Sequence, residues 1–503
     1  MDLRQILGKS AQRRLRLIEA LYFQAEGIPV ESLVTYLGCS LPVLWNDIKA
    51  VNDEEQGFFI EKRFGSVYLI KEGTASLGSI YSRLLQDSHA FQILEELLYE
   101  RHEGIAELAE GLFLSVSNAQ RYLKRIENAL APAGIQLTHR PLQLGGNEAL
   151  LRHLYYKFFI EKYHDCQLCF PLLTLEQQKS IAEFIDVFAE ENGFYRTLPL
   201  QIRLNYNLFI SAWRIKNGHF FPREILFDDY PRIPAKQQTV ELKQTLQRCF
   251  GGRWKDEELR DLVWLTAADA LVFSGEHRVR APLRNQRYWE HQQIHEELVA
   301  EYANLFGGRL TREEQADLVI VLQNATFLYP CNGPHIEILR KNQLHFTLMM
   351  QEFYGVALEQ IAACIDRVTK KYDFYREEDF RHSLLYWLVS AVPDSLRRLQ
   401  HQEIPLRVLL ITRLSPTEEA FLTRQLEQTI YGNLRIDYLR DPEESLPSVA
   451  SAYDLILSTA AIRNCPKATA FATIDPYLTW PSLRSIQQLV DRLYRRKRCE
   501  NPE

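Results

Sequence analysis

Apolar positions near the start of the chain fall into two series with the same spacing. Sliding the sequence by 75 positions pairs residues of the same kind without a gap: Ser40 with Ser115, Leu33 with Leu108, Leu37 with Leu112, Ile48 with Leu123, Lys49 with Lys124, Ile60 with Ile135, Val67 with Leu142 and Leu69 with Leu144. An ungapped echo of this length indicates two tandem copies of one small module.

The first copy predicts three helices followed by a hairpin. Apolar residues on one face predict a helix over 11–26, which Gly27 can end. A second helix begins near Val30, and Ser40 is a favourable N-cap for a third. Two alternating runs about Phe64 predict a hairpin over 58–70. A helix–turn–helix with a hairpin behind it is a winged helix, whose second helix fits the DNA major groove.

The third helix of each copy should carry the DNA-binding residues. Leu44, Ile48 and Val51 share one face and should be buried, which leaves Val43, Asn46, Lys49 and Asn52 outward. For the first copy, with the hairpin tip, we predict these DNA-binding residues: Ser40, Val43, Asn46, Lys49, Lys62 and Arg63. For the second copy we predict Ser115, Ser117, Asn118, Gln120, Arg121, Lys124 and Arg125.

The second set is richer in groups that hydrogen-bond base edges and phosphates, so we expect the second copy to be the stronger DNA reader. The alternative is that these charges only solvate a helix face. The same face is charged at the same register in both copies, which weakens that alternative.

Residues 149–400 have the pattern of apolar and polar positions that is typical of long amphipathic helices. We expect helices over 149–163, 175–192, 198–216, 237–250, 257–274, 288–306, 311–328, 336–354, 358–372 and 377–399. Gly251-Gly252 and Gly307-Gly308 are helix stops, and a boundary between two all-α bundles is expected near 278–287.

The last hundred residues alternate between strands and helices. The continuous apolar run 406–412 is typical of a buried parallel strand, and further strands are expected over 434–438, 454–458 and 470–474. Helices are expected over 417–430 and 482–497, which completes a small α/β domain with a parallel sheet.

Composition limits the function classes. A net charge of −6 over 503 residues excludes a generally basic surface, so DNA binding must come from local patches. No stretch reaches the ~20 apolar residues of a membrane span and no signal peptide is evident, so we expect a cytoplasmic protein without membrane contact. Cys166 and Cys169 lie beside His164 without a second pair, and we interpret them as reduced thiols, with a metal or redox role as the alternative.

The order of parts resembles the Mga/AtxA class of transcriptional regulators of Gram-positive bacteria. The residues that carry the resemblance are SLPVLWNDI at 40–48, SVSNAQRYLKRI at 115–126, LPLQIRLNYNLFISAWRIKNGHFF at 198–221 and EEDFRHSLLYWLVS at 377–390. In that class the bundles are PTS regulation domains (PRDs) and the last domain is IIB-like. The resemblance implies a mainly α, multidomain fold: winged helix-turn-helix domains at 1–82 and 83–147, PRD-like bundles at 148–285 and 286–402, and a IIB-like α/β domain at 403–503.

The resemblance also implies the function and partners. These are transcription activation on double-stranded DNA, self-association as a homodimer or higher assembly through the C-terminal domain, and phosphorylation of PRD histidines by phosphocarrier proteins of the phosphotransferase system (PTS). A phosphoryl group on an imidazole adds charge and acceptors and can change helix packing.

The histidine pattern of sugar-type PRDs is not present. Where a first target histidine would lie, about two helical turns before the arginine that matches Arg214, the chain has Asn207. The places expected for a second hold Trp264, Leu265, Leu384 and Leu385. His219 is the best remaining candidate, followed by His335 and His382, and the alternative for each is an ordinary surface or capping histidine.

The alternative functions are an RNA-binding antiterminator and a phosphotransferase-system enzyme. An RNA-binding antiterminator would begin with a small β domain, whereas this chain begins with the predicted paired winged helices. A phosphotransferase-system enzyme would need a cysteine after the first strand of its IIB domain, where 412–416 reads TRLSP. No GxxxxGK[ST], HExxH or Ser/His/Asp signature occurs, so we expect no catalytic residue, metal or cofactor.

Overall fold

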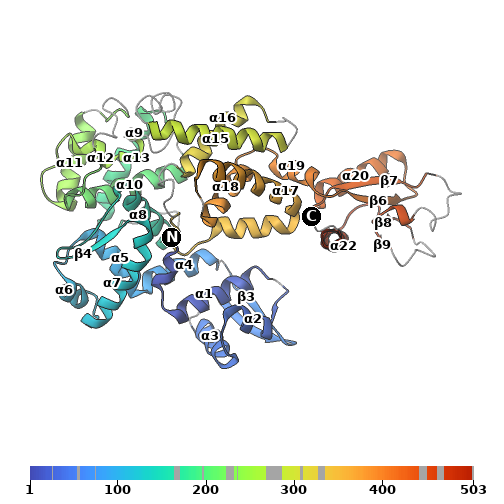
Figure 1. The fold of residues 1–503 in the computed structure, drawn as a ribbon, viewed down its shortest axis with the longest axis horizontal. Helices are drawn as coiled ribbons and strands as arrows, with labels where there is room; N and C mark the ends of the chain where they lie inside the picture. The colour runs from blue at the N-terminus through green and yellow to red at the C-terminus, as the bar shows by residue number, and fades with distance from the viewer. Residues whose placement is uncertain are drawn as a thin grey trace. The chain divides into compact units, whose positions relative to one another are not determined.

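The structure is a computed structural model, and Figure 1 shows it as a ribbon. It describes residues 1–24, 26–53, 57–73, 75–163, 170–194, 197–222, 231–234, 236–267, 286–305, 310–326, 335–375, 377–440, 450–460 and 469–500. These residues form two compact units: Met1–Gln292 with Gln323–Lys341, and Gln293–Leu322 with Asn342–Glu503. The predicted mainly helical, multidomain fold is confirmed.

The first unit begins with two similar runs of elements. The first run is η1 (Leu3–Ile6), α1 (Lys9–Tyr22), β1 (Ile28–Pro29), α2 (Val30–Leu37), α3 (Leu41–Asp53), β2 (Phe58–Arg63) and β3 (Ser66–Lys71). The second is α5 (His89–Tyr99), α6 (Ile105–Gly111), α7 (Val116–Leu130), η2 (Ala131–Ala133), β4 (Gln136–His139) and β5 (Leu142–Gly145). Helices α2 and α3 begin 75 positions before α6 and α7, the offset that the apolar pattern indicates.

Helix α3 is held by its predicted apolar face and by one ion pair. Leu44, Ile48 and Val51 are buried, as expected. On the same buried side Asp47 pairs with Arg13 of α1. Strands β1 and β2 both pair with β3 to give a three-stranded antiparallel sheet.

Helix α4 (Leu77–Asp87) lies between the two runs and was missed by the sequence analysis. Its start is a capping box, in which the side chains of Ser76 and Ser79 each accept from the backbone N–H of the other. A capping box usually has Ser or Thr at the N-cap and Glu or Gln three residues later. Here both positions are Ser, so the common sequence signature of a helix start is absent.

A helical layer follows the second hairpin. It contains α8 (Glu148–Lys162), α9 (Leu175–Glu191), α10 (Leu198–Lys216), α11 (Lys236–Phe250), α12 (Glu258–Leu262) and α13 (Trp264–Ala267). Helix α10 packs against α8, α9, α11 and α12, and most of its residues from Leu204 to Ile215 are buried. The helix expected over 257–274 is instead broken at Val263, where the backbone leaves the helical region.

Residues 335–341 correct a second expectation, because the helix predicted over 336–354 begins only at Asn342. The segment before it is bridged to the N-terminus of the chain: Leu3 N–H donates to Glu337 O at 3.2 Å, and Glu337 N–H to Met1 O at 3.2 Å. Ile336 and Ile338 are fully buried there. Backbone pairing with the N-terminus therefore replaces the helical hydrogen bonds of this segment.

The second unit contains most of α15 (Gln286–Leu305) and α16 (Arg312–Thr326), then α17 (Asn342–Tyr372), α18 (Glu378–Ser390) and α19 (Ser395–Gln402). Helix α17 joins two expected helices across a kink at Tyr354, where φ is −129° and ψ is 42°. The single helix expected over 377–399 is divided between α18 and α19, with Asp394 in a left-handed conformation at the break.

The C-terminal part of this unit is the predicted parallel sheet, which is confirmed. Strands β6 (Leu406–Ile411), β7 (Leu434–Tyr438), β8 (Leu455–Ser458) and β9 (Ala470–Thr473) lie in the order β7-β6-β8-β9, and all neighbours are parallel. Helices α20 (Pro416–Thr429) and α22 (Trp480–Glu500) supply apolar side chains to the sheet core, including Leu422, Leu426, Ile486 and Val490.

Some expectations lie outside the described residues. They include the Cys166–Cys169 pair with His164, the last part of the helix expected over 257–274, the Gly307-Gly308 stop and most of the boundary over 278–287.

Candidate functional site

The face of α7 predicted to contact DNA lies on the surface. The Ser115 side chain accepts from Asn118 N–H at 3.2 Å and caps the helix. Ala119, Leu123 and Ile126 are buried, so the other face points outward. Of the predicted residues, Ser115, Ser117, Gln120, Arg121 and Lys124 are exposed, while Asn118 and Arg125 are partly buried.

The cations of α7 are held loosely. Arg121 donates to Asn118 Oδ1 at 2.9 Å, and Lys124 pairs with Glu127 at 2.8 Å. Arg121 and Arg125 also lie 5.7 and 5.9 Å from the ring of Tyr122. Exposed pairs of this kind contribute little free energy, so both cations can exchange these partners for phosphates at small cost.

The matching face of α3 is less charged. Ser40, Asn46, Lys49, Lys62 and Arg63 are exposed, and Val43 is partly buried. Lys62 lies 5.5 Å from the ring of Trp45, while Arg63 pairs with Glu61.

Asn52 does not point outward as expected. It donates to Ile60 O at 2.9 Å and accepts from Ile60 N–H at 2.7 Å. This side chain therefore fastens α3 to β2, and the outward interpretation of Asn52 was wrong.

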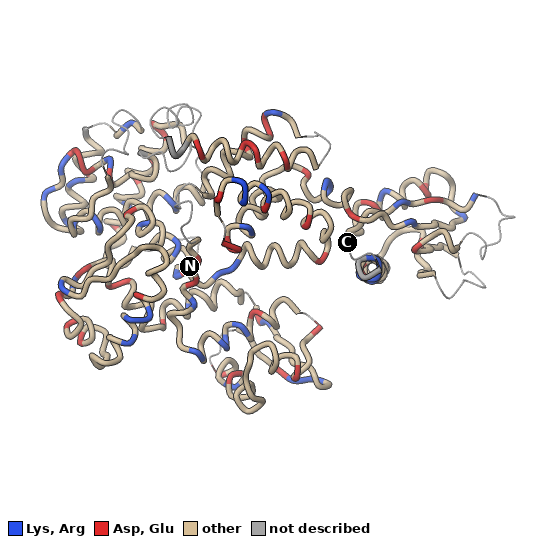
Figure 2. Tube along the Cα trace, in the orientation of Figure 1, with Lys and Arg blue, Asp and Glu red and all other residues tan. Residues whose placement is uncertain are grey.

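Figure 2 shows Lys and Arg interspersed with Asp and Glu along the described chain. This mixture of charges agrees with the net charge of −6. The positive charge on the exposed face of α7 is therefore local and is not part of a generally basic surface.

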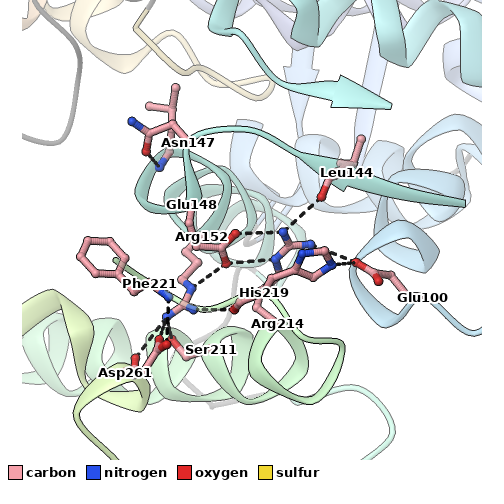
Figure 3. Close-up of polar contacts among 11 residues, drawn as sticks. Glu100, Leu144, Asn147, Glu148, Arg152, Ser211, Arg214, His219, Phe221 and Asp261 are labelled. Carbon is pink, nitrogen blue, oxygen red and sulfur yellow. Dashed lines mark hydrogen bonds and ion pairs between the residues drawn. The ribbon is translucent and has the colours of Figure 1, made fainter. Parts of the chain in front are cut away.

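Behind the second copy lies a buried charge cluster, drawn in Figure 3. At its centre are Arg152 of α8 and Arg214 of α10, whose side chains are both fully buried. Glu148 of α8 lies between them: its Oε1 is 2.8 Å from Arg152 Nε and 3.0 Å from Arg214 Nε. We call the set of Glu100, Glu148, Arg152, Arg214, His219 and Asp261 the arginine cluster.

Arg214 connects the helical layer to the second copy. Its Nη1 lies 3.0 Å from Glu100 Oε1, at the C-cap of α5, and its Nη2 donates to Leu144 O of β5 at 3.1 Å. One guanidinium thus contacts the helix that precedes α6 and the hairpin that follows α7.

Arg152 connects α8 to the segment after α10. Its Nη1 lies 2.6 Å from Asp261 Oδ1 of α12 and 3.1 Å from Ser211 Oγ. Its Nη2 donates to His219 O at 3.2 Å, and Asp261 Oδ2 accepts from Phe221 N–H at 2.9 Å. The loop that carries His219 is therefore fixed on both sides by Arg152 and Asp261.

His219 is the candidate histidine that the structure places in this cluster. Its Nε2 lies 2.7 Å from Glu100 Oε1, and its side chain is 19% exposed. The sequence analysis named His219 and Arg214 but missed Glu100, Glu148, Arg152 and Asp261. The spacing of Glu148 and Arg152, four residues apart on a helix, was the available signal for that pair.

Burial and charge act in opposite directions on the acids of the cluster. Burial alone would raise the pKa of Glu148, but hydrogen bonds and charge from Arg214 and Arg152 hold that pKa below its ordinary value. For Asp261, burial outweighs the attraction of Arg152 and raises the pKa. Two guanidinium groups, those of Arg152 and Arg214, face the three carboxyl groups of Glu100, Glu148 and Asp261 here.

The other candidate histidines are less accessible. His335 is 2% exposed, and burial, with Lys157 and the N-terminal amine nearby, holds its pKa well below the ordinary value. His382 lies with Nδ1 3.1 Å from Thr347 Oγ1, and its side chain is 12% exposed. Of the three, His219 presents the most surface.

The loop after β6 has no thiol. Thr412 there donates from its Oγ1 to Glu419 Oε1 of α20 at 2.6 Å, and Ser415 caps α20 with Glu418. Among the described residues no group of three or more His, Cys, Asp and Glu is placed to hold a metal ion. No helix in the described ranges is long and apolar enough to cross a bilayer.

The span that contains the second copy is similar to a known domain. Residues 73–159 match the model of the Mga helix-turn-helix domain, a span that contains α4 to α7, the β4–β5 hairpin and most of α8. The chain is Mga/AtxA-like.

Curated relatives agree with this likeness. A Streptococcus pneumoniae protein assigned as a trans-acting regulator is 19% identical over 470 residues, which cover 92% of this chain and 93% of that protein. The capsule synthesis positive regulator AcpA of Bacillus anthracis is 25% identical over 42% of this chain and 44% of its own length. The anthrax toxin expression trans-acting positive regulator of the same species is 26% identical over 28% of this chain and 30% of its own length.

Proposed function

We propose that the chain is a DNA-binding transcriptional activator, and that both helix–helix–hairpin copies are winged helix-turn-helix domains. The observation that carries the proposal is the exposed face of α7, within the span that matches the Mga helix-turn-helix domain. Arg121 and Lys124 extend from a helix whose N-terminus is capped and whose opposite face is buried. Such a helix can enter the major groove with its first turns toward base edges.

The activator assignment comes from the relatives. The AcpA and toxin regulators carry the words "positive regulator" in their names. We extend that property to this chain because residues 73–159, which match the Mga helix-turn-helix domain, contain its proposed DNA-binding helix.

We further propose that the arginine cluster carries a regulatory signal to the second copy. Phosphorylation of His219 would add a charge of about −1.5 to −2 within contact of Glu100. Repulsion would separate His219 from Glu100, and Arg214 would be drawn from Glu100 toward the phosphoryl oxygens. The contact between the helical layer and α5 would weaken.

The helical layer and the bundle of the second unit are proposed to be PRD-like, and the C-terminal sheet to be a IIB-like module that serves in self-association. Exposed aromatic side chains support this role for the C-terminal part: Phe421, Tyr431, Tyr477 and Trp480. A contiguous exposed apolar patch commonly marks an interface, and we propose that these four side chains contribute to one.

The test is binding of the purified full chain to random genomic duplex fragments across a salt series, with the bound fragments sequenced. Retention that falls linearly in log affinity with log salt, and that enriches particular sequences, is the expected result. Absence of retention at low salt contradicts the proposal. Binding of single-stranded RNA in preference to duplex DNA would favour an antiterminator instead.

A further inference from the structure

The turns before α3 and α7 have the same hydrogen bonds. In the first copy Gly38 N–H donates to Thr35 O and Cys39 N–H to Val34 O, both at 3.2 Å. In the second copy the corresponding bonds are Phe113 N–H to Glu110 O at 3.1 Å and Leu114 N–H to Ala109 O at 2.8 Å. Every partner is displaced by 75 positions, and the pattern is that of a Schellman C-cap.

The residue at the left-handed position differs between the two turns. Gly38 has φ of 61°, which costs glycine little. Phe113 has φ of 54°, in a region that a bulky side chain rarely adopts. A glycine would relieve this strain, so backbone preference does not explain the phenylalanine.

Burial does not explain Phe113 either. Its side chain is 97% exposed, so it gains no apolar contact with the rest of the fold. Strained and fully exposed residues often serve at functional sites, where a contact made on binding compensates the cost.

The position of Phe113 indicates what it contacts. It lies two residues before Ser115, the N-cap of α7, and Val116 in the first helical turn is also exposed. The exposed cations Arg121 and Lys124 follow on the same helix. In helix-turn-helix proteins the N-terminal residues of the second helix contact base edges, and the apolar group that a major groove presents is the thymine methyl.

We propose that Phe113 is a specificity-determining residue that contacts thymine methyl groups in the major groove. The inference rests on the proposed function, because it takes α7 as the helix that enters DNA. It assigns an apolar contact to the turn before α7, in addition to the polar contacts expected from the helix itself.

The experiment uses the full-length chain and a duplex selected by the wild-type protein, prepared once with thymine and once with deoxyuridine, which lacks only the methyl group. Wild-type protein should bind the deoxyuridine duplex about fourfold more weakly for each methyl lost from contact. Phe113→Gly and Phe113→Asn should bind the two duplexes more nearly equally, since both tolerate the left-handed backbone but lack the aromatic ring.

Two controls separate this role from damage to the fold or to the whole site. Leu172→Gly makes a comparable change at another exposed, left-handed apolar residue, between α8 and α9, and should leave the discrimination between the duplexes intact. Phe113→Gly should also unfold at the same or a higher temperature than wild type.

The outcomes distinguish the two proposals. If the wild-type chain retains no duplex, the proposed function fails and this inference fails with it. If the wild type binds and Phe113→Gly keeps the full wild-type ratio of thymine to deoxyuridine affinity, only the role of Phe113 is overturned.

Discussion

His219 Nε2 lies 2.7 Å from Glu100 Oε1, the same oxygen that lies 3.0 Å from Arg214 Nη1. A histidine after α10 and an arginine within α10 therefore share one carboxylate oxygen at the end of α5. Any charge change at His219 acts directly on the contact between the helical layer and the second copy.

The first prediction concerns this contact. His219→Asp places a carboxylate beside Glu100 and should weaken the contact, whereas the neutral His219→Gln can keep a hydrogen bond to Glu100. Amide hydrogen exchange at the C-terminal end of α5 should be faster in the Asp variant and unchanged in the Gln variant.

The same two variants, His219→Asp and His219→Gln, test the regulatory role of His219. DNA affinity of His219→Asp should fall by roughly fivefold or more, which is the lower range of measured coupling between sites. Wild-type affinity and exchange in His219→Asp would remove His219 from the regulatory role.

The second prediction concerns Glu148. Glu148→Gln leaves two fully buried guanidinium groups without their shared carboxylate, and should destabilise the first unit by roughly 3–5 kcal/mol. Urea unfolding followed by tryptophan fluorescence measures the loss. Lys179→Gln, at an exposed pair with Glu183, is the control and should change stability by less than about 1 kcal/mol.

The third prediction concerns pH and Glu161 of α8. This carboxylate accepts from Leu339 N–H at 2.9 Å and Arg340 N–H at 3.1 Å, yet burial outweighs these bonds and raises its pKa to about 7. Because the folded-state pKa of Glu161 lies above its unfolded value, the protonated side chain stabilises the folded state. That contribution to the free energy of unfolding is complete below about pH 4.5 and is lost as the pH rises through 7.

Glu161→Gln keeps the accepting oxygen without the charge. The variant should therefore unfold at a higher temperature than wild type at pH 8, while the difference should shrink toward pH 5. Equal melting temperatures of the two proteins at pH 8 would contradict the raised pKa.

The sequence predicts the repeated module well because its signal is local. The offset that pairs Ser40 with Ser115 also relates α3 to α7, since capping and the buried helix face are decided by residues within one element. The parallel sheet is predictable for a similar reason: its apolar run at Leu406–Ile411 needs no knowledge of its partners.

Long-range contacts explain what the sequence does not predict. Ile336 and Leu339 have the spacing of an amphipathic helix, but Glu337 between them pairs with the backbone of Met1 and Leu3, more than 300 positions away. Arg214 is visible in its helix, yet nothing local indicates that Glu100 is its partner.

The fourth prediction concerns self-association through the C-terminal part. Trp480 at the start of α22 is 85% exposed, and Trp480→Ser should raise the dissociation constant of a dimer by roughly tenfold or more if the ring lies at an interface. Sedimentation velocity across a concentration series measures the change. Trp289→Ser, at a tryptophan of α15 that is about half exposed, is the control and should leave association unchanged.

The last prediction tests the face of α7. Arg121→Ala with Lys124→Ala removes two exposed cations without touching the buried side of the helix. Each lost phosphate contact should reduce the slope of log affinity against log salt by about 0.9, with weaker binding across all duplex sequences.

A matched control removes equal charge elsewhere: Arg83→Ala with Lys179→Ala changes two exposed residues of α4 and α9 in the same unit. This control should keep the wild-type salt slope, because only cations at the interface release counterions from DNA. Lys49→Ala, at the position of α3 that corresponds to Lys124, then measures the contribution of the first copy to the salt dependence of DNA binding. A slope reduced by Lys49→Ala and unchanged by the α7 pair would assign the DNA contact to α3 and reject the second copy as the stronger reader.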